Sequence, residues 1–363
     1  MRARLLRRAL GRGLAVFVAF TSASAAPPDY PAVVPGHALS FPRDHGAHPD
    51  FRTEWWYVTG WLDAEGDKTL GFQVTFFRSR PELDQGNPGR FAPNQLLFAH
   101  AAVSDPTVGR LLHDQRSARV GFGLAEASRQ DTDVRIDDWS FVRLPRGSYL
   151  AKIAAREFAL DFEFAPAGGV LLQGRDGVSR KGPRPEQASY YYSRPQIVVS
   201  GTLSRGGRAL PVKGVAWLDH EWSSAYLARE ASGWDWAGIN FDDGSALMAF
   251  QIRDRHGGRF WAGGSLRGRD GKVRALGPED IRFAPRRHWR SPRTGTLYPV
   301  AMAVQAADLR IDLVPLMDDQ ELDSRASTGA VYWEGAVTAS RTGQTVGRGY
   351  LELTGYFQPL KLQ

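Results

Sequence analysis

Apolar and polar positions alternate with a period of two along most of the chain. Between Phe158 and Phe164 every second residue is Phe or Leu, and the residues between them are small or acidic. This is the pattern of a strand with one buried face. Turn dipeptides such as Gly206-Gly207 and Asp243-Gly244 recur between such runs, and no convincing amphipathic helix interrupts them. The pattern predicts an all-β fold of many antiparallel strands.

A weak internal repeat extends this prediction. The segment 56–74 turns at Gly66, and the segment 236–252 turns at Gly244 in the same way. The closing hairpins 199–218 and 337–353 also correspond. Two copies in the same order predict two lipocalin-like antiparallel β-barrels in tandem, over residues 51–225 and 226–363. Residues 26–50 are rich in Pro, Ala and His, and we expect them to form an extended lead-in.

The first 25 residues have the composition of a targeting segment. Five arginines and no acid precede an apolar run at 14–20, and Ala23-Ser24-Ala25 follows. This order is typical of a secretory signal cleaved after Ala25. The apolar run is far shorter than the roughly 20 residues that span a bilayer. We therefore expect a periplasmic or secreted protein that is not an integral membrane protein, with Sec and twin-arginine export both open.

The net charge and the absence of cysteine exclude several classes of partner and of chemistry. The formal net charge is +7, and five of these charges lie in the segment to be removed. The mature chain is then close to neutral, so a nucleic-acid partner, which needs a basic patch, is not expected. The chain has no cysteine, which excludes disulfides, thiolate metal ligands and a thiol nucleophile.

The densest group of ionisable and aromatic residues lies at 217–222. Asp219, His220 and Glu221 stand between two indoles. In a strand His220 and Trp222 face one way, and Asp219 and Glu221 face the other. One face could present an imidazole beside an indole to a cavity, where desolvation shifts the pKa toward proton transfer. Alternatively, the acids pair with arginines at a domain junction and His220 is a satisfied core residue.

A second group, Glu54–Tyr57, repeats the theme of an acid beside large aromatics. Glu54 could act as a general acid or base held against indoles, or could simply begin a Trp-rich strand. The segments 234–236 and 332–334 have a similar composition. Such alternation is typical of barrels that hold a flat or polyene-like ligand, but it also arises from cross-strand aromatic packing.

Metal and cofactor motifs are not found in the sequence. The eight histidines show no H-x-H or H-E-x-x-H spacing, so we expect no metal and no cofactor. His45 and His48, with Asp44 and Asp50, could at most bind a cation weakly. No G-x-S-x-G elbow occurs, and Ser223-Ser224 beside His220 is the only support for serine hydrolysis.

A series of motifs, kept in order over about residues 45–360, resembles the AttH/carotenoid 1,2-hydratase-like family. The resemblance implies two lipocalin-like barrels in one chain, in agreement with the internal repeat. The motifs that carry it are His48-Pro49, Glu54–Tyr57, Gln73–Arg78, Phe98–Ala101, Tyr191-Tyr192-Ser193, Val199-Ser200-Gly201, Ala216–Ser224, Gly233–Trp236, Ser291–Gly295 and Tyr332–Gly335.

The resemblance implies several activities. Some members hydrate a terminal double bond of acyclic carotenoids, fungal relatives are pericyclases, and others from ABC-exporter operons are described as secreted hydrolases or transport accessories. The hydratases use a His-x-Trp pair, which His220 and Trp222 match. They also use a downstream Tyr-x-Asp pair, but the counted positions hold Leu247 and Ala249.

Together these observations predict an exported protein that binds a hydrophobic isoprenoid, lipid or acyl ligand and could hydrate it. A secreted hydrolase and an ABC-transporter-associated accessory protein without catalysis are the alternatives. The candidate catalytic residues are Glu54, Asp219, His220, Glu221 and Asp243. The candidate ligand-binding residues are Trp55, Trp56, Tyr57, Gln73, Tyr192, Trp222, Trp234, Trp236 and Trp333.

Overall fold

The computed structural model describes residues 29–66, 68–82, 92 and 94–360. The predicted signal segment lies outside these residues. One 3-10 turn, η1 (Arg43–His45), is the only helical element in the described part of the chain, and antiparallel strands make up the two sheets. The all-β prediction is confirmed. No helix among the described residues is long and apolar enough to cross a membrane.

The first sheet has the strand order β4-β3-β2-β1-β13-β12-β9-β8-β7-β6-β5, and β10 and β11 pair with β12. It curls until β3 and β4 contact β6, which gives the N-terminal barrel. The bounds are β1 (Thr53–Ala64), β2 (Lys68–Ser79), β3 (Leu96–Ser104), β4 (Leu111–Arg119), β5 (Ala125–Ala127), β6 (Asp133–Ile136), β7 (Trp139–Arg143), β8 (Tyr149–Ala154), β9 (Ala159–Pro166), β10 (Leu171–Leu172), β11 (Val178–Arg180), β12 (Ala188–Arg205) and β13 (Arg208–Ser223).

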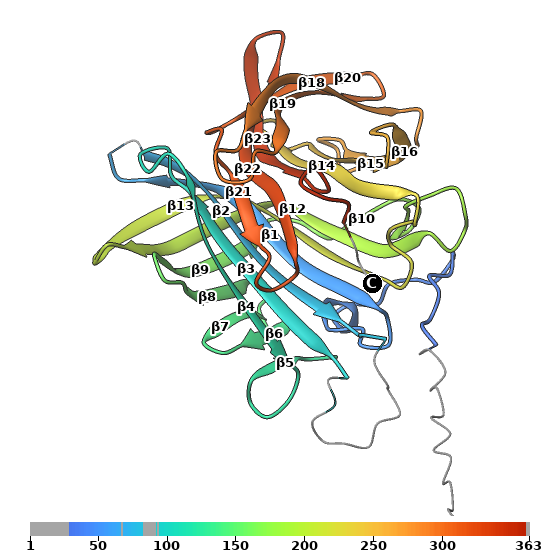
Figure 1. The fold of residues 1–363 in the computed structure, drawn as a ribbon, viewed down its shortest axis with the longest axis horizontal. Coiled ribbons are helices and arrows are strands. Elements are labelled where there is room, and N and C mark those ends of the chain that lie inside the picture. The colour runs from blue at the N-terminus through green and yellow to red at the C-terminus, as the bar shows by residue number, and fades with distance from the viewer. Residues whose placement is uncertain (1–28, 67, 83–91, 93, 361–363) are drawn as a thin grey trace, which may run out of the picture.

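The second sheet has the order β17-β16-β15-β14-β23-β22-β20-β19-β18, and β21 pairs with β22. Its strand β18 contacts β15 and β16, which gives the C-terminal barrel above the first in Figure 1. The bounds are β14 (Ala231–Phe241), β15 (Ala246–Asp254), β16 (Arg259–Arg267), β17 (Val273–Leu276), β18 (Ile281–Arg290), β19 (Leu297–Ala306), β20 (Leu309–Pro315), β21 (Glu321–Ser324), β22 (Ala330–Arg341) and β23 (Gln344–Leu353).

The internal repeat appears in the topology. In the N-terminal barrel the first hairpin joins the last through the neighbours β2-β1-β13-β12, and in the C-terminal barrel through β15-β14-β23-β22. The strand β13 ends at Ser223 and β14 begins at Ala231. The segment 224–230 therefore connects the two sheets.

The two faces of β1 pack into two different hydrophobic cores. Trp56, Val58 and Leu62 lie in the core of the N-terminal barrel, whereas Tyr57 and Trp61 lie in a cluster that also contains residues of the C-terminal barrel. Because both faces are covered, β1 is buried almost throughout, as strands between two apolar layers are. This double burial explains why the sequence here is richer in aromatics than a half-buried strand requires.

The barrels approach closely at Gly71 on β2. A Cβ atom at this position would lie 2.6 Å from the Cβ of Ala336 on β22 and 3.1 Å from the hydroxyl of Tyr350 on β23. Glycine is therefore the residue that lets these two sheets touch.

The lead-in is docked on the N-terminal barrel. Its Val33, Leu39 and Phe41 pack against Tyr192 and Trp222, and residues 44–48 are buried. The His45 carbonyl accepts hydrogen bonds from the Trp56 indole and from the hydroxyl of Thr132. The lead-in thereby brings polar side chains into the barrel.

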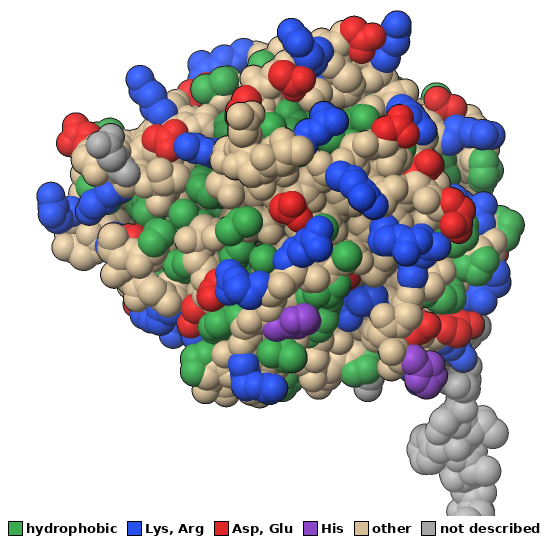
Figure 2. Space-filling view, turned by 90° about the horizontal axis from the view of Figure 1, so that it is seen from above, with side chains coloured by type: hydrophobic (Ala, Val, Ile, Leu, Met, Phe, Trp, Pro, Cys, Tyr) green, Lys and Arg blue, Asp and Glu red, His purple; other side chains and the backbone are tan. Residues whose placement is uncertain are grey.

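The surface in Figure 2 carries basic and acidic side chains that are interspersed over the visible face. Surface ion pairs of the C-terminal barrel include Arg287 with Asp318 and Arg286 with Asp312. This face therefore presents no extended field of a single sign.

Candidate functional site

The antiparallel pairing of β1 with β13 places the two sequence motifs side by side. Trp56 is opposite His220, and Tyr57 is opposite Asp219. His220 lies against Trp56 in the N-terminal barrel, whereas Asp219 bonds to Tyr191 in the cluster between the barrels. The side chains of 219 and 220 thus face opposite ways, as the strand geometry predicts. Two distinct polar groups result.

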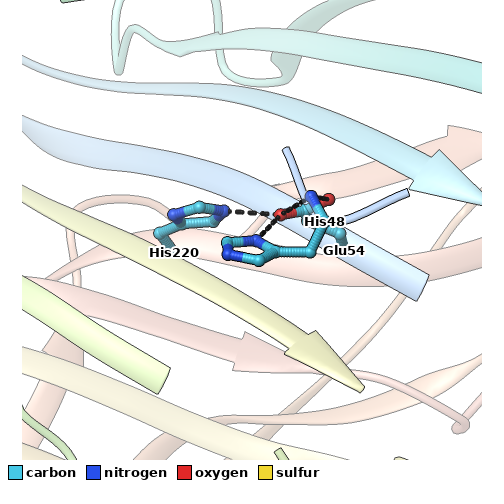
Figure 3. Close-up of side chains that lie close together, drawn as sticks. All are labelled: His48, Glu54 and His220. Atoms are coloured by element: carbon cyan, nitrogen blue, oxygen red, sulfur yellow. Dashed lines mark hydrogen bonds and ion pairs between the residues drawn. The ribbon is translucent and has the colours of Figure 1, made fainter. Parts of the chain in front are cut away.

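The first group, which we call the inner cluster, is centred on Glu54 inside the N-terminal barrel. Its Oε1 lies 2.7 Å from Nδ1 of His48 and 2.9 Å from Nε2 of His220 (Figure 3). Its Oε2 accepts a 2.7 Å hydrogen bond from Nε of Arg78. The lead-in, β1, β2 and β13 each contribute one of these side chains, so the cluster joins four segments of the chain.

Aromatic rings enclose the inner cluster. The His48 ring stacks on Trp222 with centroids 3.7 Å apart, and His220 stacks on Trp56 at 4.7 Å. The hydroxyl of Tyr192 lies 3.2 Å from Nδ1 of His220. Three predicted ligand-binding residues, Trp56, Tyr192 and Trp222, therefore pack around the cluster instead of lining a free cavity.

The charges of the inner cluster balance locally. Burial pushes the pKa of Glu54 upward, but the His48 and Arg78 charges outweigh it and hold this pKa well below its ordinary value. Burial opposes the charged form of His48, yet the Glu54 carboxylate raises its pKa. Burial lowers the pKa of His220. The cluster thus contains an ionised Glu54 between cationic His48 and Arg78, with a neutral His220. The second negative charge comes from buried Asp44, whose Oδ1 lies 3.3 Å from Nε2 of His48.

The same atoms of His48, Glu54 and His220 lie within 4.8 Å of one another, a spacing that could hold a metal ion. Two imidazoles and a carboxylate are common metal ligands. However, Arg78 already supplies a positive charge to Glu54, and the amide of His48 also donates to this carboxylate. The donor set therefore fits a buried ion-pair network better than a cation site.

The second group lines a cavity of about 650 Å³ between the two barrels. Its walls come from β1, β2, β3 and β13 on one side and from β14, β22 and β23 on the other. The aromatic side chains in these walls are Trp55, Tyr57, Phe77, Phe98, Tyr191, Tyr226, Trp234, Trp236 and Tyr332. The predicted ligand-binding residues Trp55, Tyr57, Trp234 and Trp236 are among them.

Besides Glu54, two predicted acids lie in this cavity wall, and both have partners. Asp219 accepts hydrogen bonds from Tyr191 at 2.6 Å, Trp217 at 2.6 Å and Ser193 at 2.5 Å. Burial raises the pKa of Asp219 to about 7, although these donors oppose the shift. Glu221 forms a 2.7 Å ion pair with Lys181, which is itself buried.

Glu334 on β22 and Glu352 on β23 are cavity residues that the sequence reading did not select. They are opposite each other in the β22–β23 register. Burial raises the pKa of Glu334 to about 8. Burial and the Glu334 charge raise the pKa of Glu352 well above its ordinary value. The alternation in Tyr332-Trp333-Glu334 was the available signal, because it places Glu334 on the face opposite the core residue Trp333.

A polar link at one wall of the cavity connects the barrels. Nδ1 of His100 on β3 lies 2.7 Å from the Tyr332 hydroxyl, and its Nε2 lies 2.9 Å from Oγ of Ser327. Burial lowers the pKa of His100 to about 3. A neutral imidazole that bonds at both nitrogens is a connector between β3 and the β21–β22 region.

Several predicted site residues lie elsewhere. Asp243 is exposed in the β14–β15 turn, where its carboxylate accepts bonds from Ser245. Gln73 is buried and bonds to Thr75, and Trp333 belongs to the core of the C-terminal barrel. None of these three lines the cavity.

His220 and Glu54 are brought together, but in the inner cluster. The cavity wall includes Glu54 and Arg78 and does not include His220. Leu247 and Ala249, which stand at the counted Tyr-x-Asp positions, are buried in the C-terminal core and offer no acid there.

Two lipocalin-like barrels with an aromatic and carboxyl-lined cavity between them define the class of this protein. The AttH-like family model matches residues 32–356. The chain belongs to the AttH-like family, which confirms the resemblance read from its motifs.

Solved structures agree with this assignment. A crystal structure of a proposed AttH protein from Nitrosomonas europaea is 55% identical, with a TM-score of 0.85, and the match covers 90% of this chain and 99% of that one. Kievitone hydratase from Nectria haematococca is 13% identical, with a TM-score of 0.68, over 92% of this chain and 98% of that one. The second likeness is one of fold. A comparison with curated proteins returned no match.

Proposed function

We propose that this protein binds a hydrophobic ligand in the cavity between its barrels and adds water to a carbon–carbon double bond of that ligand. The observation that carries the proposal is the cavity itself, which combines nine aromatic side chains with buried carboxyl groups. Ligand sites are typically concave and mostly apolar, with a few polar groups that fix orientation. We further propose that the protein works after export.

Hydration suits this combination of groups. Addition of water to an alkene needs a proton donor, and it passes through a cation that must be shielded from bulk water. Carboxyl groups whose pKa burial has raised remain protonated near neutral pH. Aromatic faces such as those of Trp236 and Tyr332 stabilise a nearby cation. The fold shared with kievitone hydratase is consistent with this chemistry.

His220 has a supporting part in this proposal. Its imidazole is buried in the inner cluster and bonds to Glu54, which is itself a lining residue of the cavity. His220 therefore acts on the ligand only through Glu54, by holding β13 and β1 in register beside the cavity.

Binding is tested by titration with the fluorescent polyene cis-parinaric acid. Trp55 and Trp234 are half-buried and line the cavity, whereas Trp289 is half-buried on β18 outside it. Loss of a large aromatic contact costs roughly 1–2 kcal/mol, so Trp55→Ala and Trp234→Ala should each weaken binding by about tenfold. Trp289→Ala is the matched control and should bind as wild type does. Absence of saturable binding, or equal affinity in all four proteins, would contradict the proposal.

A further inference from the structure

Two buried polar groups without a well-formed hydrogen bond line the cavity, one from each barrel. Glu334 is 3% exposed and Tyr57 is 6% exposed. Both line the cavity, and the Tyr57 hydroxyl faces Glu334, but neither that hydroxyl nor Oε1 of Glu334 makes a hydrogen bond of good geometry. Native proteins rarely leave buried polar atoms unpaired. These two groups come from different barrels, so the gap between them is a place where a ligand or a proton is expected.

Glu352 completes this arrangement. It is directly opposite Glu334 on the neighbouring strand and also lines the cavity. In the described part of the chain, no Lys, Arg or His lies within ion-pair distance of either carboxyl; every ion pair found there involves other acids. Two ionised carboxylates at such a spacing repel each other strongly, so one of them retains a proton.

We propose that Glu334 and Glu352 share one proton and form the acid–base pair that hydrates the ligand. This inference rests on the proposed function and names the groups that carry it out. The other four cavity acids already have partners. Asp219 accepts three hydrogen bonds, and Glu221 is paired with Lys181 and Ser189. Glu54 bonds to His48 and Arg78, and Glu82 pairs with Arg52. Donors of this kind favour the ionised form. The Glu334–Glu352 pair has no cationic partner: its neighbouring donors are the neutral Tyr57 hydroxyl beside Glu334 and the Trp234 side chain beside Glu352. Both carboxyls line the cavity.

The reaction needs only the two carboxyl groups, one water molecule and the alkene. The protonated carboxyl transfers its proton to one alkene carbon, and the π electrons form the new C–H bond. The other carbon becomes a cation, which a water oxygen attacks. The second carboxylate accepts the proton that this water loses. One water is thereby added across the double bond, and the pair again holds one proton.

Other titratable groups around the pair are consistent with this role. Tyr57 and Tyr350 face Glu334, and burial together with that carboxylate raises the pKa of each phenol. Asp219 and Glu221 lie on the opposite wall and add negative charge near Glu352. The surroundings of the pair therefore supply no competing cation, and they favour retention of its proton.

The shared proton is tested by infrared spectroscopy on the full chain at pH 7. Wild type should show a protonated-carboxyl C=O band that Glu334→Gln and Glu352→Gln each remove. Glu279→Gln, a change at a side chain that is 89% exposed, should keep the band. The Asp219→Asn variant shows how much of the absorption in this part of the spectrum comes from Asp219. Absence of the band from wild type, or its survival in both Glu334→Gln and Glu352→Gln, would overturn the proposal.

Catalysis is tested separately with the acyclic alkenes myrcene, squalene and lycopene in isotope-labelled water. Wild type should give a product heavier by one labelled water, and Glu334→Gln and Glu352→Gln should lower kcat/KM by about 10²–10⁴-fold. Full activity in both variants would overturn the acid–base role. No product from wild type would count against the proposed hydration, whereas the infrared band would still decide whether the pair shares a proton.

Discussion

Glu54 on β1 and His220 on β13 are 166 positions apart in the chain and are joined by a 2.9 Å hydrogen bond. The same carboxylate bonds His48 from the lead-in and Arg78 from β2. One buried acid therefore ties together the lead-in, the first hairpin and the last strand of the N-terminal barrel. Removal of its charge would leave Arg78 buried without a counter-ion, and would leave His48 with only Asp44, 3.3 Å from its Nε2.

Glu54→Gln should destabilise the protein by about 3–5 kcal/mol, the usual cost of breaking a buried ion pair on one side. The measurement is the free energy of unfolding in urea. Glu65→Gln, at an exposed position in the β1–β2 turn, is the control and should change it by less than about 0.5 kcal/mol. A loss below about 1 kcal/mol for Glu54→Gln would show that the inner cluster is not a structural centre.

The inner cluster should also give stability a dependence on pH. The pKa of Glu54 is lower in the folded than in the unfolded protein, so its contribution is present above about pH 4.3 and is lost on acidification. The pKa of His48 is higher in the folded protein, so its contribution is present below about pH 6.5 and is lost as the pH rises through the folded value. Both directions follow from the mutual attraction of these two groups.

The contribution of the His48–Glu54 pair to the free energy of unfolding should therefore be greatest near pH 5–6. His48→Gln should flatten the decline on the alkaline side. His256 is exposed in the β15–β16 turn, and His256→Gln should leave the decline as it is in wild type. Identical pH profiles for wild type and His48→Gln would rule out an ion pair between His48 and Glu54.

Gly71→Ala tests the contact between the barrels. The added methyl group would meet the Cβ of Ala336 at 2.6 Å, and neither backbone can yield without moving the barrels apart. Overpacking of this kind costs about 1–3 kcal/mol. Gly169→Ala is the control, because no atom lies within 4 Å of its added Cβ. A Gly71→Ala protein as stable as the control in thermal unfolding would mean that the barrels do not pack at this point.

Asp243→Ala should leave polyene binding and hydration unchanged. Its carboxylate is exposed and caps its own turn at Ser245, far from the lining of the cavity. The same fluorescence titration and product assay provide the measurement. A large loss of activity in Asp243→Ala would indicate that the ligand binds at the β14–β15 turn.

Much of the fold follows from local patterns. The alternation at 158–164 became β9, and the repeat of turns at Gly66 and Gly244 became two corresponding hairpins. Period-two alternation separates the two faces of a strand. It correctly predicted that His220 and Trp222 lie on one face of β13 and that Asp219 and Glu221 lie on the other. It does not say which face points into a barrel, because both faces of β13 near Asp219 are buried.

The site was harder to predict because it depends on long-range pairing. Arg78 and His48 reach Glu54 through the β1–β2 register and the docked lead-in, and neither contact leaves a local signal. Glu352 stands among aliphatic residues on β23 and becomes part of a site only through its partner strand and the other barrel. Trp333 was predicted to bind the ligand because it stands between Tyr332 and Glu334, which do line the cavity. The alternation of the strand instead turns Trp333 into the core of the C-terminal barrel.

Native mass spectrometry of the protein, purified without detergent, tests whether the cavity holds a ligand. We expect a complex with one apolar molecule, which denaturation releases and which is identified by its mass. Substitution of the cavity residue Ala330 by Trp should lower the occupied fraction, since this side chain lines the cavity. A protein that is empty as purified, and still empty after exposure to an envelope lipid extract and to polyenes, would contradict the account and favour an accessory role without a ligand.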